Sequence, residues 1–355
     1  MALPAVLTEW MPCIMIWLVE IVFGWNHIIN KMALNSGIDP FAMLIYRQIA
    51  AAVVLSPAVY REWQTLPPIT RPVLFQIFLC SLLGATLNQG FFIVGLIYST
   101  PTIASAVANL FPGMTFVAAR LFGLETMNIW TRSGQAKVVG TVICLCGTMV
   151  MSFYHGPLLL FESDLYWNEL AEGVKGGQKA TILGPVLVFL SCASCAGWFV
   201  IQDRLNRTFF APYTTTFLMT VMSIPQFGVI GVVESLVTHK SVGHWALGFN
   251  VRLLAVLYSG ILVSGFGFPV TTWCIQRRGS PYVAMFSPLV LIIVAIIGWF
   301  LLHESIHVGP LLGATLIIVG LYMFVWGKNQ EIGRQENAAV DNQIVNGDGA
   351  QVAQA

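Results

Sequence analysis

The sequence predicts an all-α polytopic membrane protein with ten transmembrane helices arranged as two inverted five-helix repeats. Hydrophobic residues make up 57% of the 355 residues and charged residues only 9%, whereas soluble domains average about 25% charged residues. The apolar residues fall into ten runs, each long enough for the ~20 residues that cross a bilayer core. Short motifs of the first half also recur in the second half, 173 to 180 residues further on.

The ten predicted spans follow one another through mostly short connections. They are expected near 12–32, 41–60, 73–96, 102–122, 136–154, 182–201, 213–235, 253–274, 282–302 and 308–327. The longest polar interruption, 155–181, is predicted as an extracytosolic loop that connects a first repeat at 12–154 with a second repeat at 182–327. The tail 328–355 is predicted as disordered and cytosolic, because its apolar content is too low to form a core.

Internal motifs define the two repeats. Motifs that recur 173 residues later are Gly24-Trp25 as Gly197-Trp198, and Gly140 with Gly147 as Gly313 with Gly320. Because each repeat holds an odd number of spans, the second repeat must cross the membrane in the opposite sense. Such inverted repeats are typical of alternating-access carriers, whose substrate site lies near the midplane of the membrane.

Basic residues predict the orientation of the chain. Loops alternate between the two sides, and one side holds only Lys31, Lys175, Lys179, Lys240 and Arg252 of the loop Lys and Arg residues. The richer side is expected to be cytosolic, with both termini in it.

Amide side chains and a proline lie within the third and fourth spans. The residues on these two helix faces are Asn88, Gln89, Phe92, Ser105, Asn109 and Pro112. Pro112 leaves the carbonyl of Ala108 without its helical donor and is a candidate structural hinge. We predict a substrate-facing wall here. The alternative is that the amides only bond neighbouring helices together, at about 1 kcal/mol each.

The first span carries Glu20, the only acid placed well inside any span. An ionisable residue at that depth is a functional candidate by default, so Glu20 and His27 are the candidates for proton coupling. The alternatives for Glu20 are a structural ion pair with Arg47 of the second span or a hydrogen bond between helices, and the alternative for His27 is a packed side chain.

Further substrate-binding candidates come from both repeats. They are Trp25, Trp198, Gln202, Thr271, Trp273, Met285 and Ser287. Pro288 is the second candidate hinge, because it frees the carbonyl of Ala284 as Pro112 frees that of Ala108.

Catalytic, metal and cofactor sites are not predicted. The cysteine pairs Cys144/Cys146 and Cys192/Cys195 lie in apolar runs without a hydrophilic ligand cluster, which favours helix packing. No zinc-protease motif, paired intramembrane aspartates or nucleophile elbow is present, which disfavours a membrane-embedded enzyme.

Several short motifs, taken together in register, resemble the plant nodulin-like UMAMIT transporters, which include the vacuolar auxin carrier of the walls-are-thin type. The matching text is Tyr46-Arg47, Asn88-Gln89-Gly90-Phe91, Ser99-x-Pro101, Asn109-x-x-Pro112, Trp273-Cys274, Ser287-Pro288-Leu289 and Gly320-Leu321-Tyr322. The resemblance implies the EamA-type drug/metabolite transporter fold, transport of amino acids or auxin-like acids, and a plasma or vacuolar membrane. One departure is Arg277-Arg278-Gly279-Ser280-Pro281, where the family usually has Gly-Pro.

The expected function is therefore transport of a small organic solute, by facilitation or proton coupling. Amino acids are the first candidates and indole-3-acetate (auxin) the alternative. A membrane-embedded enzyme or a scaffold without transport is disfavoured. The expected partners are the solute and the lipid bilayer, with a homodimer left open. The net charge of +1 argues against nucleic acid.

Overall fold

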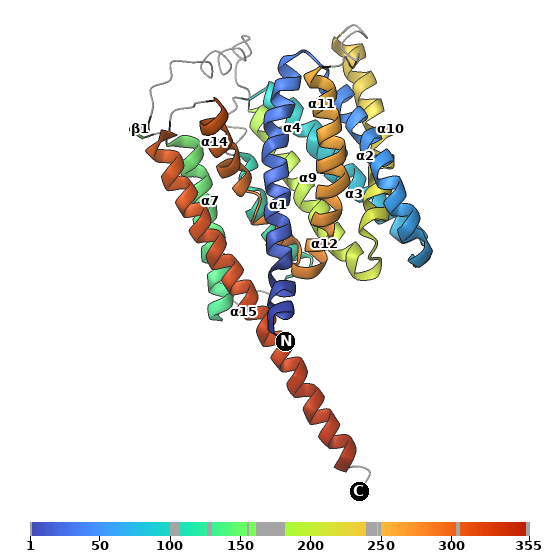
Figure 1. Cartoon of the computed structure of the whole chain (residues 1–355), viewed down its shortest axis with the longest axis vertical. Helices are drawn as coiled ribbons and strands as arrows, with labels where there is room; N and C mark the ends of the chain where they lie inside the picture. The colour runs from blue at the N-terminus through green and yellow to red at the C-terminus, as the bar shows by residue number, and fades with distance from the viewer. Residues whose placement is uncertain are drawn as a thin grey trace.

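A computed structural model describes residues 2–99, 107–125, 130–154, 156–160, 182–238, 247, 250–302 and 306–352. The helices form one bundle, with both termini at the same end and the last helix projecting beyond it (Figure 1). Across the described residues, nine helices are long and apolar enough to span a membrane. The predicted fourth span, 102–122, lies partly outside the described residues, which include its second part from 107 onward.

The first repeat contains five groups of helical segments. They are α1 (Ala2–Asn35); α2 (Pro40–Glu62) with the 3₁₀ turn η1 (Trp63–Thr65); α3 (Arg71–Cys80), η2 (Ser81–Leu87) and α4 (Asn88–Ile97) in one span; α6 (Phe111–Leu121); and α7 (Arg132–Phe153). Local sequence sets several boundaries. At the start of α2, the carboxylate of Asp39 accepts hydrogen bonds from the backbone N–H groups of Phe41 and Ala42, and Pro40 occupies the first turn.

The second repeat follows the same plan. Its segments are α9 (Leu183–Thr208); α10 (Pro212–Thr238); α11 (Val251–Tyr258), η4 (Ser259–Gly267) and α12 (Phe268–Arg278) in one span; α13 (Ser280–Ala284) and α14 (Leu289–Leu302); and α15 (Val308–Val352). A short antiparallel pair, β1 (Leu158–Leu160) with β2 (Ile306–His307), joins the beginning of the predicted connecting loop to the segment before α15.

Both repeats depart from regular α-helix at matching places. In each repeat the third span contains a π-helical segment, η2 in the first and η4 in the second. Both prolines singled out in the sequence coincide with helix breaks. Pro112 lies in the first turn of α6 after a turn at 109–110, and Pro288 lies between α13 and α14. π-Segments and proline breaks often mark functional regions of a helix.

Helix contacts support the inversion of the two repeats. A Cβ atom at Gly140 of α7 would lie 2.6 Å from the carbonyl oxygen of Gly320 of α15, and one at Gly147 would lie 2.9 Å from that of Gly313. Because the earlier glycine of α7 meets the later glycine of α15, these two helices run in opposite directions. They lie side by side at one edge of the bundle (Figure 1).

The second helices of the two repeats are also antiparallel. Glu62, the last residue of α2, accepts hydrogen bonds at Oε2 from the backbone N (2.6 Å) and Oγ1 (2.7 Å) of Thr214, near the start of α10. The pair α2 and α10 occupies the edge opposite α7 and α15 (Figure 1). Two repeat-related helix pairs are thus each antiparallel, as the inverted repeat predicts.

The C-terminal segment differs from the sequence-based expectation. Disorder was expected from residue 328, but α15 continues as helix to Val352. Its first turns after the span are fixed by ion pairs of Lys328 and Glu331 with the bundle. The following residues, which are rich in Asn, Gln, Gly and Ala, are helical although Asn and Gly are weak helix formers. Low hydrophobicity alone therefore does not exclude a helix.

Candidate functional site

Aromatic rings from four helical segments meet in the middle of the bundle. The ring of Trp198 (α9) lies 5.4 Å from that of Phe268 and 5.0 Å from that of Phe199. Phe268 also contacts Phe23 of α1, and Phe199 contacts Phe111 of α6. All four pairs are edge-on or steeply inclined, a favourable geometry for aromatic rings.

Trp198 lies between the two π-helical segments. A Cβ atom at Gly84 of η2 would lie 2.5 Å from Cγ of Trp198, so only glycine lets the indole pack this closely. On its other side the indole contacts Phe268, the residue directly after η4. Trp198 is 5% exposed, and its Nε1 has no hydrogen-bond partner among the described residues. A buried donor without a partner is unusual and calls for an explanation.

Arg47 of α2 lies beside this aromatic cluster. Its side chain is buried, its Nε donates a hydrogen bond to Oγ of Ser264 at 2.9 Å, and its Cζ lies 5.6 Å from the ring centroid of Phe268. The alternative ion pair with Glu20 is not formed in this structure, where no described carboxylate lies within ion-pair distance of Arg47. Glu20 is itself buried, and its Oε2 has no partner in the described part of the chain.

The other polar candidates of the first span lie in more open surroundings. The side chains of His27 and Trp25 are exposed on the surface of α1, Trp25 to 38%. For a helix that crosses a bilayer, such a surface includes the part that faces lipid, which suits an indole. Their predicted roles in proton coupling and substrate binding stay predictions.

The amide of Asn88 bonds two helices together. Its Nδ2 donates to the carbonyl of Ser191 on α9 at 3.3 Å, and Oγ of Ser191 donates back to the carbonyl of Asn88 at 2.7 Å. Its neighbour Gln89 is half-buried, and the Oε1 atom has no partner among the described residues. Phe92 is half-buried one turn further along α4.

The fourth span shows a similar bond. Nδ2 of Asn109 donates to Oγ of Ser152 on α7 at 3.1 Å. The carbonyl of Ala108, which Pro112 deprives of its helical donor, lies 3.7 Å from Sγ of Cys192 on α9. Ser105 falls outside the described residues. In this structure the amide groups of both Asn88 and Asn109 thus donate to neighbouring helices, which is the alternative to the predicted solute contact.

The candidates of the second repeat are mostly buried. Nε2 of Gln202 donates to Oδ1 of Asn206 at 2.9 Å, and Sδ of Met285 lies 3.7 Å from Oγ1 of Thr141. Thr271 is buried, with no partner for Oγ1 among the described residues. The half-buried ring of Trp273 lies beneath the guanidinium of Arg277, at 5.6 Å.

The break at Pro288 is capped locally. The carbonyl of Ala284, which Pro288 deprives of its helical donor, accepts a hydrogen bond from Oγ of Ser287 at 2.8 Å and one from the backbone N–H of Ser287 at 3.1 Å. Ser287 therefore satisfies the freed carbonyl in this structure. A hinge role of Pro112 and Pro288 stays a prediction.

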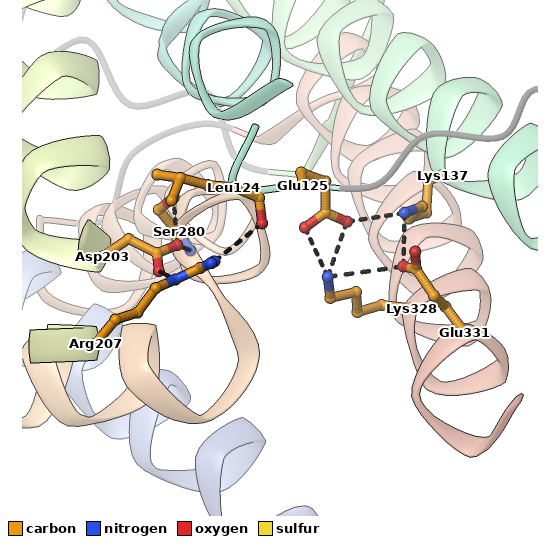
Figure 2. A network of polar contacts seen from close by, with 8 residues as sticks. All are labelled: Leu124, Glu125, Lys137, Asp203, Arg207, Ser280, Lys328 and Glu331. Carbon is orange, nitrogen blue, oxygen red and sulfur yellow. Dashed lines mark hydrogen bonds and ion pairs between the residues drawn. The ribbon is translucent and has the colours of Figure 1, made fainter. Parts of the chain in front are cut away.

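A charged network closes the end of the bundle from which α15 projects (Figure 2). Nζ of Lys137 (α7) lies 2.8 Å from Oε1 of Glu125 and 2.7 Å from Oε2 of Glu331 (α15). Nζ of Lys328 lies 2.6 Å from Oε2 of Glu125. Glu125 and Lys137 are 2% and 1% exposed, so the pair is held away from water. The network joins the segment after α6 to the last helices of both repeats.

A second contact at the same end fixes the start of α13. Oδ2 of Asp203 (α9) accepts hydrogen bonds from the backbone N and Oγ of Ser280 at 2.9 and 3.0 Å. Arg207 contacts Oδ1 of Asp203 at 3.4 Å and donates to the carbonyl of Leu124 at 3.1 Å (Figure 2). Gly279 adopts φ = +90°, which glycine accommodates without strain. The segment Arg277 to Pro281, which departs from the usual family sequence, therefore lies at this end of the bundle.

Sequence reasoning did not select the members of this network as site residues. In the sequence each of Glu125, Lys137 and Asp203 lies near the end of a predicted span, but the sequence alone does not say which of them meet. A surface cavity of about 370 Å³ lies beside the network, lined by residues including Phe122, Val200, Arg204 and Arg207. None of the predicted substrate-binding residues lines it.

The fold and this arrangement of sites define a class: multi-pass membrane transporters built from two copies of one helical unit. The EamA-like transporter family model matches the chain twice, at residues 10–153 and 182–326. The chain belongs to the EamA-like transporter family.

Curated relatives from Arabidopsis thaliana support the same assignment. WAT1-related protein At3g30340 is 32% identical over 326 residues, covering 91% of this chain and 88% of its own length. Protein WALLS ARE THIN 1 is 33% identical over 343 residues, covering 93% and 87%. These matches confirm the family resemblance recognised in the sequence.

A solved crystal structure supports the fold. It aligns with a TM-score of 0.64 at 14% identity, covering 90% of this chain and 98% of the other. Since the identity is low, this likeness concerns the fold alone.

Proposed function

We propose that this protein carries small organic solutes across a membrane, with amino acids as the first substrate candidates. The observation that carries the proposal is a set of buried polar atoms without partners inside four different spans. They are Oε2 of Glu20, Oε1 of Gln89, Nε1 of Trp198 and Oγ1 of Thr271, each unpaired among the described residues. Unsatisfied polar groups at membrane depth are expensive unless a solute or water occupies the site.

The charged network suits the alternating-access mechanism of inverted-repeat carriers. It joins α7, α15 and the segment after α6 at one end of the bundle, and Asp203 joins α9 to α13 there. In such a mechanism the network would hold this end closed while the solute enters from the other end. We propose that this end, with both termini, is cytosolic.

Indole-3-acetate is the second substrate candidate. The rings of Phe23, Trp198, Phe199 and Phe268 form a continuous cluster at mid-span, which suits an aromatic solute.

The proposal is tested with purified full-length protein in proteoliposomes. Uptake of labelled L-amino acids and of indole-3-acetate is measured with and without a pH gradient, and empty liposomes are the control. We expect saturable uptake of at least one of these solutes, with competition by its unlabelled form. Uptake equal to that of empty liposomes across the whole panel would contradict the proposal.

A further inference from the structure

Arg47 is a cation buried within the span Pro40–Thr65, 7% exposed. Its contacts in the described part of the chain are one hydrogen bond, from Nε to Oγ of Ser264, and the face of Phe268. The two terminal nitrogens of its guanidinium group donate to no described residue. A buried cation without a counter-ion costs several kcal/mol, so its retention suggests that an anion occupies the site in another state.

The position of Arg47 is fixed by close packing. A Cβ atom at Gly260 of η4 would lie 2.6 Å from Cβ of Ala50 and 3.0 Å from the carbonyl oxygen of Arg47. The π-helical segment therefore lies directly against α2, and Ser264, one turn further on, binds Nε. With one edge of the guanidinium held in this way, the two terminal nitrogens have the planar geometry that matches a carboxylate.

The neighbouring rings offer a place for the rest of such a solute. Phe268 lies 5.6 Å from Cζ of Arg47 and contacts both Trp198 and Phe23. A charged group and an apolar surface are thus adjacent at mid-span. The unpaired Nε1 of Trp198 adds a donor on the same cluster.

The inverted repeat argues against a purely structural role. Pro40-Phe41 of α2 matches Pro212-Tyr213 of α10, and the same offset makes Met219 the residue of the second repeat that is equivalent to Arg47. Met219 is buried to a similar degree, 4% exposed. An apolar residue therefore satisfies the packing at this helix position in the second repeat. The cation at the equivalent position of the first repeat is not needed for packing, which favours a role in binding.

We infer that Arg47 binds the carboxylate of the transported solute while the rings of Phe268 and Trp198 pack against its apolar part. This inference rests on the proposed function and narrows it, because it requires a carboxylate in the substrate. It gives the polar contact with the solute to Arg47 rather than to the predicted wall of Asn88 and Asn109, whose amide N–H groups donate to neighbouring helices.

The test uses pairs of probes that share the same body. Full-length protein is incubated with indole-3-acetate or indole-3-acetamide, and with L-phenylalanine or L-phenylalaninamide, and affinity is read from thermal stabilisation and from competition with uptake. Wild-type protein should bind the better acid at least about tenfold more tightly than its amide. In Arg47→Gln the affinity for that acid should fall about 10- to 100-fold, while the affinity for the amide changes by less than about twofold.

Two further variants separate the effect of charge from that of guanidinium geometry and control for the loss of an arginine elsewhere. Arg47→Lys retains the charge but not the planar fork, so it should keep the preference for the acid with an affinity several-fold weaker. Arg252→Gln is the matched control, because this arginine lies at the start of α11 and donates from Nε to Ser36 at the bundle surface. It should leave both affinities unchanged.

The outcomes distinguish a failure of the Arg47 assignment from a failure of the proposed transport function. If a probe pair is transported but acid and amide bind equally to wild-type protein, or if Arg47→Gln weakens both equally, the assignment of Arg47 is wrong and the carrier function stands. If no acid or amide of the panel binds or crosses, the proposed function fails and this inference with it. Should Arg47→Gln not fold, the comparison of acid with amide in wild-type protein and in Arg47→Lys still decides whether Arg47 binds the carboxylate.

Discussion

Nζ of Lys137 lies 2.8 Å from Oε1 of Glu125, and both side chains are almost completely buried. Lys328 and Glu331 complete a network of two ammonium and two carboxylate groups around this pair. Removing one member of a buried ion pair is more harmful than removing both, because the remaining charge loses its partner without regaining water. Loss of one charge from this network should therefore destabilise the bundle end from which α15 projects (Figure 2).

The change Glu125→Gln should loosen this end. Among the described carboxylates, Glu331 would then remain as the ion-pair partner of Lys137 and Lys328. We expect a loss of about 3 kcal/mol or more in unfolding free energy. Thermal unfolding measures the loss, and labelling of a cysteine introduced at Ser280 reports opening of this end. The double variant Glu125→Leu with Lys137→Met should recover much of the stability. If Glu125→Gln unfolds like wild-type protein, the buried network does not stabilise this end.

The change Asp203→Leu should release the start of α13. Oδ2 of Asp203 accepts two hydrogen bonds from Ser280, and those two donors have no other acceptor among the described residues. We expect a loss of about 1 to 3 kcal/mol, as for a buried donor left unpaired. Ser280→Ala, which retains the backbone bond, should lose less. Equal stability of Asp203→Leu and wild-type protein would argue against this role.

The sequence predicted features that depend on local chemistry. The helix breaks at Pro112 and Pro288 could be predicted, because proline removes a backbone donor wherever it stands. The recurrence of Gly140 and Gly147 as Gly313 and Gly320 was visible in the sequence, but their contact across α7 and α15 was not. The partner of Asn88 could not be predicted, because the bond to Ser191 depends on which helix is its neighbour. Lys137 and Glu331 were missed for the same reason, since one looked like a loop charge and the other lay in a segment predicted as disordered.

Helix contact at glycine gives a prediction with an internal control. A Cβ atom at Gly140 would lie 2.6 Å from the carbonyl oxygen of Gly320 and 2.7 Å from the backbone N of Phe324. Since backbone atoms cannot turn away, Gly140→Ala should separate α7 from α15 and lower stability by about 1 to 3 kcal/mol. Gly228→Ala on α10 meets nothing within 4 Å and should be neutral or slightly stabilising. Equal thermal unfolding of the two variants would contradict the close packing.

The interhelical amides give a prediction that separates packing from binding. We expect Asn88→Leu and Asn109→Leu each to lower stability by about 1 kcal/mol, because each loses a hydrogen bond to a neighbouring helix. Substrate affinity, once corrected for stability, should remain close to wild type. A loss of affinity without a loss of stability in either variant would instead restore the substrate-facing wall predicted from the sequence.

Glu20 provides the test of proton coupling. Its carboxyl group is buried in the first span, and no described cation lies within ion-pair distance of it; Arg47 bonds to Ser264 instead. Glu20→Gln should therefore fold with wild-type yield. Glutamine mimics the protonated acid and cannot release a proton. If Glu20 carries the proton, exchange of substrate at equal concentrations should persist and uptake driven by an inward proton gradient should be lost, both measured in proteoliposomes.

The matched comparison is His27→Gln, because His27 is the other candidate for proton coupling and lies on the same helix with an exposed side chain. If the gradient acts through Glu20 alone, His27→Gln keeps gradient-driven uptake. If Glu20→Gln retains full gradient-driven uptake, Glu20 does not carry the proton and the transporter is a facilitator or is coupled elsewhere. A joint loss of folded yield and of both transport modes would point to a structural role, and Glu20→Gln combined with Arg47→Gln would then show whether a charge pair forms in another state of the cycle.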